Sequence, residues 1–354
     1  MASTPTMKAK KGFYPLLLMF IIALAGCYNA AMMPESRDLR LFLIAVDGKY
    51  GYRKIDGNMV IEPCSPVKTG DFSEGLAAMP DPCDNGRRWG YIDASGKFMI
   101  TPQFRTAEAF SEGLAAVQIG EKWGFIDKNG TIVIKPDYVS AGRFSEGLAW
   151  VRVCGQHDGG YTCPYGYIDR QGKMVIPPFT FSSGSFSEGL AVVEVDGKYG
   201  YMDRRGHMLV EPQFDFSAQP FSEGLARIRL NGKFGYIDKS GNLKIDATFD
   251  AAGNFSEGVA YAGVNGKYGF IDKTGAFVIS PTYDLILVDT GFHQGFACVG
   301  TGEEDNESFY YINKTGKRVT EEAYDWCGNF NGGFAPVHIG GDRFYINTDG
   351  KRIW

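Results

Sequence analysis

Residues 110–136 read F-S-E-G-L-A-A-V-Q-I-G-E-K-W-G-F-I-D-K-N-G-T-I-V-I-K-P, and two phrases in this stretch recur along the chain. The first phrase, F-S-E-G-L-A or F-S-E-G-V-A, begins at Phe72, Phe110, Phe144, Phe186, Phe221 and Phe255. Altered copies begin at Phe292 (F-H-Q-G-F-A) and Phe330 (F-N-G-G-F-A). Self-similarity at such a spacing indicates a tandem repeat protein, so the 354 residues predict one elongated or ring-shaped body rather than several globular domains.

The second phrase, aromatic-Gly-aromatic-Ile-Asp-x-x-Gly, keeps step with the first. Its leading position is occupied by Tyr50, Trp89, Trp123, Tyr165, Tyr199, Phe234, Tyr268, Phe309 and, in a degenerate last copy, Arg343. Most copies are 34 or 35 residues apart, but three intervals are longer, at 39, 42 and 41 residues. The longer intervals predict surface loops inserted into an otherwise regular array.

Three short apolar runs in each repeat predict a three-stranded antiparallel meander. In one repeat the runs are residues 225–230, 233–238 and 242–245. Asn231-Gly232 between the first two is a two-residue type I′ hairpin signal, because both central positions need a positive φ. The Asp238-x-x-Gly241 segment predicts a longer hairpin in which Asp accepts hydrogen bonds from the turn backbone. The chain is therefore expected to be all-β, with about nine such meanders.

Glycine and proline refine this expectation. The Gly after the leading aromatic residue is expected to leave room for an aromatic ring of a neighbouring layer. A proline often follows the third run and is expected to end that strand, because it cannot donate a ladder hydrogen bond (Pro102, Pro136, Pro177, Pro212 and Pro281). Nine repeats are many for a propeller, so an open curved array or solenoid is favoured, with a closed propeller-like ring as the alternative.

These phrases together resemble the WG-repeat family of bacterial proteins. Its unit reads roughly F-x-E-G-L-A-x-V, K-W-G-Y-I-D-x-x-G and K-x-V-I-x-P, and residues 110–136 are an almost complete instance. The resemblance covers about residues 41–354 and implies tandem β-repeats that mediate binding or display, with no catalytic residues. Tyr310 and Phe344 replace the motif glycine in the last two copies, as is common in terminal repeats.

The N-terminus predicts an exported, lipid-anchored protein. Three lysines (Lys8, Lys10 and Lys11) precede an apolar run at residues 13–24, which is shorter than the roughly 20 residues that a membrane-spanning helix needs. Leu24-Ala25-Gly26-Cys27 resembles a bacterial lipobox, which implies cleavage before Cys27 and lipidation of its thiol. We therefore expect a signal peptide at residues 1–26, a lipidated tether at 27–40 and the repeat domain at 41–354.

The expected location is the bacterial cell envelope. Tyr28, rather than Asp, follows the lipobox cysteine, and by resemblance to Gram-negative lipoproteins this implies the outer membrane, with the periplasmic or surface face left open. Removing the leader removes three lysines and no acid, so the net charge changes from −5 to −8. A nucleic-acid partner is not expected, since such proteins normally present a basic face.

Six cysteines remain after Cys27, and an even number in an exported protein predicts disulfides. Sequence alone permits fifteen pairings for six cysteines. Proximity favours the pairs Cys64–Cys83, Cys154–Cys163 and Cys298–Cys327, and the second pair is best supported because it flanks one hairpin. A metal site is the alternative, but no C-x-x-C motif or histidine partner has the required spacing.

Neither the repeated acids nor the histidines predict catalysis. A Glu recurs in each of the six intact copies, and an active site needs one pair of carboxylates in unlike environments rather than a row of equivalents (Glu74, Glu112, Glu146, Glu188, Glu223 and Glu257). The four histidines match no metal or triad spacing (His157, His207, His293 and His338). We expect no catalytic, cofactor or metal residues, and no cofactor.

The three longer loops are the candidate recognition sites, because loops on a rigid scaffold commonly carry binding. Their candidate residues are Arg87 and Arg88, then His157, Asp158 and Tyr161, and finally Glu303, Glu304 and Asp305. The favoured function is a membrane-anchored binding, adhesion or interaction scaffold whose ligand is a protein or a glycan. The alternative is a carbohydrate-active envelope enzyme that uses the repeat glutamates.

Overall fold

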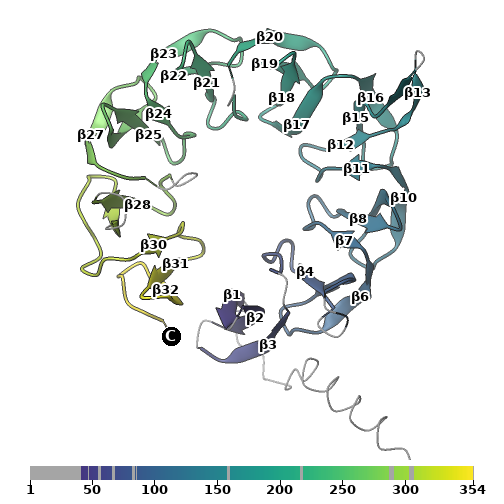
Figure 1. Cartoon of the computed structure of the whole chain (residues 1–354), viewed down its shortest axis with the longest axis horizontal. Helices are drawn as coiled ribbons and strands as arrows, with labels where there is room; N and C mark the ends of the chain where they lie inside the picture. The colour runs from purple at the N-terminus through teal and green to yellow at the C-terminus, as the bar shows by residue number, and fades with distance from the viewer. Residues whose placement is uncertain are drawn as a thin grey trace, which may run out of the picture.

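The computed structural model describes residues 41–353 apart from gaps at 47, 55–56, 66–67, 82–83, 85, 158–159, 216–217, 287–290 and 303–306. All secondary-structure elements of these residues are β-strands, which confirms the all-β prediction. In this part of the chain no helix has the length and hydropathy required to cross a bilayer. Figure 1 shows the strands gathered in small sheets that follow one another around an open centre.

Each of the nine leading positions of the second phrase lies on a different sheet, and we number these sheets as units one to nine. Units one to four consist of β1 (Leu41–Val46), β2 (Lys49–Lys54) and β3 (Met59–Ser65); β4 (Ala77–Pro80), β5 (Trp89–Ile92) and β6 (Phe98–Phe104); β7 (Thr106–Ala107), β8 (Ala115–Ile119), β9 (Lys122–Ile126) and β10 (Ile132–Tyr138); and β11 (Ser140–Ala141), β12 (Ala149–Arg152), β15 (Tyr165–Ile168) and β16 (Met174–Phe179).

The remaining units continue in chain order. They are β17 (Ser182–Ser187), β18 (Leu190–Val195), β19 (Lys198–Asp203) and β20 (Met208–Phe214); β21 (Ala226–Leu230), β22 (Lys233–Ile237) and β23 (Leu243–Phe249); β24 (Ala251–Ala252), β25 (Val259–Val264), β26 (Lys267–Asp272) and β27 (Phe277–Tyr283); β28 (Phe296–Thr301) and β29 (Ser308–Asn313); and β30 (Trp326–Cys327), β31 (Phe334–Ile339) and β32 (Asp342–Asn347). A separate hairpin, β13 (Gly155–His157) with β14 (Gly160–Thr162), extends from unit four.

The strands pair as antiparallel meanders, as the hairpin signals predict. The first central residue of three two-residue turns has a positive φ: 49° at Asp196, 51° at Asn231 and 53° at Asn265. A glycine with positive φ follows each of them, which is the type I′ geometry. Local turn chemistry therefore fixes the register of the first two strands in these units.

The I-D-x-x-G segment forms the second hairpin of each unit, also as predicted. In unit three, the Oδ1 atom of Asp127 accepts hydrogen bonds from the backbone N–H groups of Asn129 (2.9 Å) and Thr131 (2.9 Å). Gly130 then adopts a φ of 81°. In unit eight Asn313 takes the place of Asp and accepts the equivalent bonds from Thr315 and Lys317, so an amide oxygen serves the turn as well as a carboxylate does.

This substitution allows a test of acid stability. The backbone N–H of Thr131 holds the pKa of Asp127 below its ordinary value, and the Thr274 hydroxyl does the same for Asp272. An unfolded Asp titrates near pH 4. Each carboxylate therefore contributes stability above about pH 4, which is lost as the pH falls through the lower folded pKa. As the pH falls from about 5 to 2.5, we expect the melting temperature of the Asp127→Asn, Asp272→Asn variant to fall less steeply than that of the unmodified protein.

The control for this prediction is the same variant at pH 7. Its melting temperature there should be slightly below that of the unmodified protein, because asparagine keeps the turn bonds but lacks the charge, and the two profiles should converge in acid. Equal steepness of the two acid profiles in a calorimetric titration would contradict the role given to these aspartates.

The strand-two glycine has a different role from the one expected. A Cβ on Gly124 would lie 2.6 Å from the carbonyl oxygen of Ile134, and one on Gly235 would lie 2.6 Å from that of Ile245. The glycine therefore admits the backbone of the third strand, not an aromatic ring. That strand bulges here: in unit two Trp89 pairs with Phe104 while Tyr91 pairs with Ile100, so the register shifts between them.

The prolines lie inside this bulge and do not end the strand. Pro102 belongs to β6, which continues to Phe104 and still pairs with Trp89. Proline is tolerated there because a bulge leaves positions that have no ladder partner to donate to. The expectation that proline ends the third strand was therefore wrong.

Units eight and nine show what happens without the glycine. Tyr310 and Phe344 stand in its place, and the third strand is reduced to isolated bridges: Phe309–Tyr324 and Ile312–Arg318 in unit eight and Ile346–Arg352 in unit nine. The Arg318 guanidinium lies 4.4 Å from the Tyr310 ring centroid, and that of Arg352 lies 4.1 Å from the Phe344 centroid. A side chain at this position thus replaces the close backbone approach with a stacked arginine.

Several units have a fourth strand that the three apolar runs did not predict. β7, β11 and β24 are two residues long, and each directly follows the third strand of the preceding unit. They pair with the first strand of their own unit; Thr106, for example, lies opposite Gln118. In Figure 1, β7 and β17 lie towards the centre and β10 and β20 at the outer rim, so the chain crosses from the outer edge of one sheet to the inner edge of the next.

The core is divided among the junctions between units. The phenylalanine that begins the first phrase packs on the second aromatic residue of the preceding unit, with ring centroids 4.7 Å apart for Phe110 and Tyr91 and 4.9 Å for Phe221 and Tyr201. These side chains are at most 2% exposed. The interpretation of the repeated aromatic residues as packing between units is therefore confirmed.

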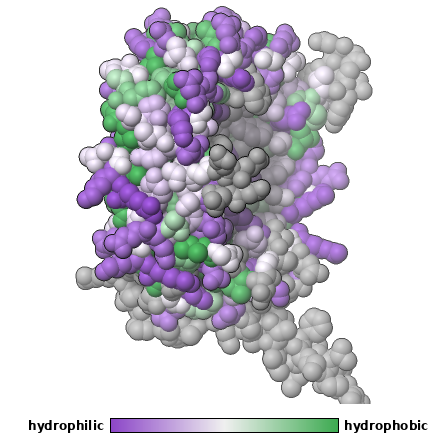
Figure 2. All heavy atoms as spheres, turned by 60° about the vertical axis from the view of Figure 1, so that its left-hand side comes forward, coloured by the Kyte–Doolittle hydropathy of each residue, from purple (hydrophilic) through white to green (hydrophobic). Residues whose placement is uncertain are grey.

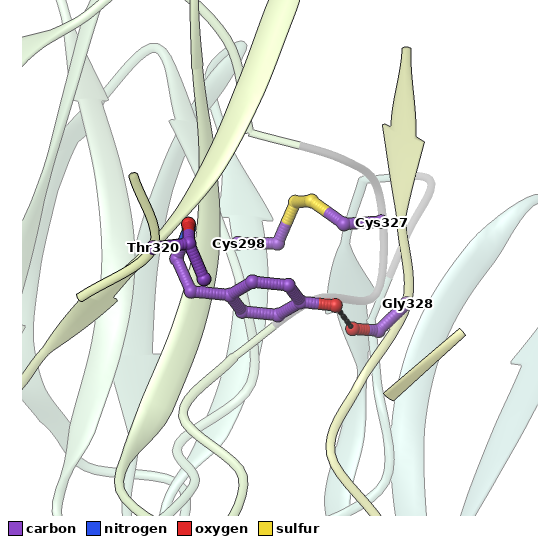
Figure 3. The surroundings of a disulfide bond; sticks show 5 residues. Cys298, Thr320, Cys327 and Gly328 are labelled. Carbon is purple, nitrogen blue, oxygen red and sulfur yellow. Dashed lines mark hydrogen bonds between the residues drawn. A yellow bond between two sulfur atoms is a disulfide. The ribbon is translucent and has the colours of Figure 1, made fainter. Parts of the chain in front are cut away.

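The last two units are joined covalently as well. A disulfide links Cys298 of β28 to Cys327 of β30, as sequence proximity favoured (Figure 3). Beside it the Tyr311 hydroxyl donates a hydrogen bond to the Gly328 carbonyl oxygen at 2.7 Å. Cys298 and Cys327 are both buried, so the bond belongs to the core of this junction.

The first and last units also meet. The Phe42 ring of β1 lies 4.7 Å from the Tyr345 ring of β32 and 5.3 Å from the Phe334 ring of β31. The Tyr345 hydroxyl donates to the Leu43 carbonyl oxygen at 3.2 Å. Figure 1 shows these two sheets side by side.

The outer face visible in Figure 2 is mainly hydrophilic, and its hydrophobic residues lie in small separate groups. Exposed hydrophobic side chains on the outermost strands include Leu243 of β23 and Val278 of β27. Single exposed hydrophobic residues are normal on a folded protein. This face therefore presents no extended hydrophobic surface, and the junctions between units are the next candidates for a site.

Candidate functional site

The repeated F-S-E-G phrase forms a tight hairpin at the inner end of each junction. Ser73 and Leu76 exchange two backbone hydrogen bonds, of 2.9 and 3.1 Å, around the central pair Glu74-Gly75. Glu74 has a φ of 53° and Gly75 a φ of 90°, which again indicates a type I′ turn. A left-handed glutamate is uncommon, so the position must be held by other interactions.

The glutamate side chain provides one of those interactions by reaching the next turn. Glu112 accepts a hydrogen bond from the Gly147 N–H at 2.9 Å, and Glu223 accepts one from the Gly258 N–H at 3.0 Å. The full series of turn-to-turn bonds is Glu74–Gly113, Glu112–Gly147, Glu146–Gly189, Glu188–Gly224, Glu223–Gly258, Glu257–Gly295 and Gln294–Gly333. Units two to nine are thus joined in succession through a carboxylate or amide oxygen.

Serine and lysine reinforce the same junctions. The Ser111 hydroxyl donates to the Phe144 carbonyl oxygen of the next turn at 2.7 Å. Lys128 lies 3.2 Å from the carboxylate of Glu74 and donates to its carbonyl oxygen at 3.0 Å. Lys128 is exposed, and so are the equivalent lysines of other junctions (Lys239, Lys273 and Lys314). Exposed ion pairs contribute little to stability, so we attribute most of the stability of the junction to the bonds made with backbone groups and hydroxyls.

The repeated glutamates are therefore equivalent in structure. Each described glutamate of the series is engaged by a backbone N–H, and the one whose pKa shift is resolved, Glu257, follows the same pattern. Burial raises its pKa, but the Lys314 ammonium and the backbone N–H groups outweigh this and hold the pKa below its ordinary value. No two of these carboxylates form a pair in unlike environments, which is the arrangement that acid–base hydrolysis needs.

The turn-to-turn series is interrupted on both sides of unit one, whose described residues contain no F-S-E-G turn. The final turn has Gly332 at the glutamate position and therefore no side chain to reach onward. The first turn glycine, Gly75, has no glutamate before it, and its N–H meets no acceptor among the described residues. We call this interruption the seam.

A cavity of about 1090 Å³ occupies the seam. Its walls are β1, the first turn at residues 72–75, the residue 93–95 hairpin of unit two, the last turn near Asn331, and two side chains of β32, Arg343 and Tyr345. The volume is at the upper end of the range of ordinary ligand pockets, roughly 300–1,000 Å³. The cavity therefore has room for a ligand larger than a single metabolite.

The seam cavity combines apolar and charged groups. Phe72 and Pro336 provide apolar walls, while Lys68, Asp71 and Arg343 provide charge. Burial raises the pKa of Tyr345, the Arg343 guanidinium opposes that rise, and the carboxylate of Asp71 adds to it. The Nε atom of Arg343 is buried and has no hydrogen-bond partner among the described residues, as is also the case for Nε of Arg227 and Arg229.

The loop predicted around Arg87 and Arg88 lies between β4 and β5. Asp84 organises it: the Arg88 Nε donates to Asp84 Oδ2 at 2.7 Å, and the Arg87 N–H donates to Asp84 Oδ1 at 2.9 Å. Both arginines are exposed. Arg88 is thus engaged within its own loop, while the Arg87 side chain faces solvent.

The other candidate loops belong to different units. Cys154 and Cys163 form the expected disulfide at the base of the β13–β14 hairpin, which carries the backbone of His157 and Tyr161. The side chains of these two residues, the whole of Asp158, and Glu303, Glu304 and Asp305 lie outside the described residues. So do Cys27, Cys83 and the Cys64 side chain. The strands that flank the three loops belong to the sheets of units two, four and eight.

No group of three or more His, Cys, Asp or Glu side chains in the described ranges converges as a metal site would require. Of the predicted recognition residues that the structure describes with their side chains, neither Arg87 nor Arg88 lines the seam cavity. Sequence signals for the seam existed: Arg343 at an aromatic position, Gly332 at a glutamate position, and Phe42 where every other unit has a buried alanine. Each signal becomes interpretable once the two chain ends are seen together.

The fold and the junctions between units define a tandem all-β repeat protein, in which small antiparallel sheets are joined by turns that bond to one another. The chain belongs to the WG containing repeat family, whose model matches residues 89–123, 123–155, 165–199, 199–234, 234–268, 268–303 and 311–341. The family resemblance drawn from the motifs is thereby confirmed for this region.

Among solved structures, one titled "Crystal structure of the eukaryotic initiation factor" is similar with a TM-score of 0.59 and 11% identity over 89% of each chain. AztD from Citrobacter koseri gives a TM-score of 0.46 and 13% identity over 88% of this chain and 98% of that one. Only the first similarity supports a likeness, and at this identity it is a likeness of fold alone. A search of curated proteins finds no match.

Proposed function

We propose that this protein is a binding scaffold that takes its ligand in the seam cavity. The observation that carries the proposal is the interrupted series of turn-to-turn bonds. Seven junctions are closed by a Glu or Gln oxygen on a glycine N–H, whereas the seam leaves the Gly75 N–H facing a cavity of about 1090 Å³. The two junctions of unit one, with unit nine and with unit two, lack this bond, and both border the same cavity, which distinguishes this position from the other seven junctions.

The proposal includes a closed ring rather than the open array favoured from the repeat count. Its support is the contact of β1 with β31 and β32 through Phe42, Phe334 and Tyr345. The pKa of Tyr52 is raised by burial and, in part, by the proximity of Tyr345, which is consistent with the same neighbourhood. A closed ring holds both walls of the cavity in fixed positions, which reduces the cost of ordering on binding.

We further propose that the scaffold is held in the bacterial envelope by a lipid on Cys27, at the outer membrane. The support is the lipobox sequence at residues 24–27 and two disulfides, which are typical of oxidising compartments. The ligand is then a protein or glycan of the envelope or its surroundings. The face of the membrane is left open by these arguments.

The alternative function, a carbohydrate-active enzyme, is less well supported. Each repeat glutamate already accepts a backbone hydrogen bond in the next turn, so its carboxylate has a structural use. We therefore propose a non-enzymatic scaffold.

A blocked cavity tests the proposed function. Ser95 lines the seam cavity, whereas Ser240 occupies the equivalent hairpin position of unit six and does not line it. Both serines are exposed. Full-length protein, Ser95→Trp and Ser240→Trp are immobilised, and the components each retains from envelope extracts are quantified.

We expect at least one component to be retained by the unmodified protein and by Ser240→Trp but lost with Ser95→Trp. Identical retention by all three would contradict binding in the cavity. Retention of nothing, together with a new glycan-hydrolysing activity in the extract, would favour the enzyme instead.

A further inference from the structure

The structure of the other units defines what is missing at the seam. In unit three the segment before β8 pairs with its inner edge: the Glu108 N–H donates to the Ala116 carbonyl oxygen at 2.9 Å, and Ser111 exchanges two backbone bonds with Leu114. The same segment then forms the F-S-E-G turn. The first strands of units two to seven are therefore each covered by an extended segment that ends in an acidic hairpin, and in units eight and nine Gln294 and Gly332 replace the glutamate.

β1 is the exception. Ile44 lies opposite Gly51 as Val117 lies opposite Gly124, so Leu41 and Leu43 correspond to Leu114 and Ala116. β1 is an edge strand of its sheet, with β2 on one side and no described strand on the other. The backbone groups that would bind the covering segment thus face the seam cavity, which Leu41 and Leu43 line.

The hydroxyl of Tyr345 supports this reading. At an ordinary junction the tyrosine hydroxyl donates to the covering segment, as Tyr91 does to the Glu108 carbonyl oxygen at 2.6 Å. At the seam Tyr345 donates instead to the Leu43 carbonyl oxygen of β1 itself. Phe42 also replaces the buried alanine of the other units and packs on Tyr345, in the manner of a turn phenylalanine. Phe42 and Tyr345 thus replace the aromatic contact of an ordinary junction, but no described residue replaces the covering strand or the turn carboxylate.

The chain's own sequence does not supply the missing turn. Counting back from Leu41, the F-S-E-G positions are occupied by Arg37, Asp38, Leu39 and Arg40. Leu39-Arg40 is a poor central pair for a type I′ turn, which needs a positive φ at both positions. Among the described residues the Gly75 N–H and the buried Nε of Arg343 have no hydrogen-bond acceptor, and Phe72, Gly75 and Arg343 all line the cavity.

We propose that the seam cavity binds an extended peptide of a partner protein, in which an acidic hairpin turn follows an aromatic residue. The proposal rests on the proposed function and names its ligand class. The peptide adds as a strand to the edge of β1 that no described strand covers, and its backbone shares the Leu43 carbonyl oxygen with the Tyr345 hydroxyl. Because Phe42 already packs on Tyr345, the aromatic ring of the peptide enters the part of the cavity lined by Phe72 and Pro336, and its carboxylate accepts the Gly75 N–H. Main-chain pairing supplies affinity and the side chains supply specificity, as in other strand-addition complexes.

The array provides its own probe. A synthetic peptide with the sequence of residues 250–259, D-A-A-G-N-F-S-E-G-V, contains one covering segment and its turn. Its binding to the full chain is measured by fluorescence polarisation. We expect saturable 1:1 binding that weakens about tenfold or more when the peptide carries Phe255→Ala or Glu257→Gln.

The two tryptophan variants locate that binding. Ser95→Trp should abolish it and Ser240→Trp should preserve it. Absence of saturable binding, or binding that Ser95→Trp leaves unchanged, would overturn the inference. If Ser95→Trp still abolishes retention of an envelope component that is not such a peptide, for example a glycan, the proposed function survives and this inference fails.

Hydrogen exchange gives an independent readout. The Leu41 and Leu43 amides should exchange quickly in the free protein and become protected when the peptide binds. Strong protection without peptide would show that the β1 edge is already paired, by the chain's own N-terminal residues or by a second copy, and would overturn the inference.

Discussion

Phe221→Ala is expected to destabilise the protein by about 3–5 kcal/mol, the usual cost of removing a buried phenylalanine ring. The Phe221 side chain is 2% exposed and packs on Tyr201 of the preceding unit, with centroids 4.9 Å apart. Its loss would open a cavity in the middle of a junction and weaken the contact between two units. In a repeat array such interface terms hold neighbouring units together, so the effect should reach beyond the substituted unit.

Chemical denaturation measures this effect, and Phe277→Ala is the matched control. Phe277 lies on the outer strand β27 and is 37% exposed, so its truncation should cost far less. A second variant, Phe221→Leu, retains most of the side-chain volume and should fall between the two. Equal losses for Phe221→Ala and Phe277→Ala would contradict the junction role of the repeated phenylalanine.

Gly269→Ala is expected to cost about 3 kcal/mol, at the upper end of the range for overpacking. An added Cβ would meet the carbonyl oxygen of Ile279 and would lie 2.7 Å from the Pro281 nitrogen. Both are backbone atoms of the bulged strand β27 and cannot rotate aside. The third strand must therefore move away or lose its pairing with β26.

The control for this prediction is Gly184→Ala. A Cβ on Gly184 would have no atom within 4 Å, and its φ is not positive, so stability should change little. Comparison of the two denaturation midpoints isolates the close backbone approach from the general effect of replacing glycine. If Gly269→Ala proved as mild as the control, the bulge would be too soft to explain why glycine recurs there.

Sequence reasoning predicted the features that depend on neighbouring residues. Asn231-Gly232 and the Asp127 turn have direct local signatures, and their hairpins were identified correctly. The role of Gly124 was misread, because a bulge in the next strand is not visible in a period-two pattern. The short strand β7 was missed because two residues give no periodicity.

The Glu-Gly turn could be predicted only in part. Glu112-Gly113 has the form of an Asn-Gly or Asp-Gly hairpin signal, but glutamate is not a usual residue at a positive φ. Its position is explained by the Gly147 N–H of the following unit, a contact between units that no local rule describes. The seam was beyond prediction for the same reason, since Phe42 and Arg343 are far apart in sequence and gain meaning only when the chain ends meet.

The central claim is that the first and last units adjoin across a cavity in which no described strand pairs with the edge of β1. A photoreactive p-benzoylphenylalanine placed at Arg343, which lines the cavity, tests it most directly. After irradiation, mass spectrometry of mixed heavy and light protein separates links within a chain from links between chains. The account predicts intrachain links from position 343 to residues 41–43 or 68–75, and their absence, with links only to neighbouring units or to other copies, would contradict it.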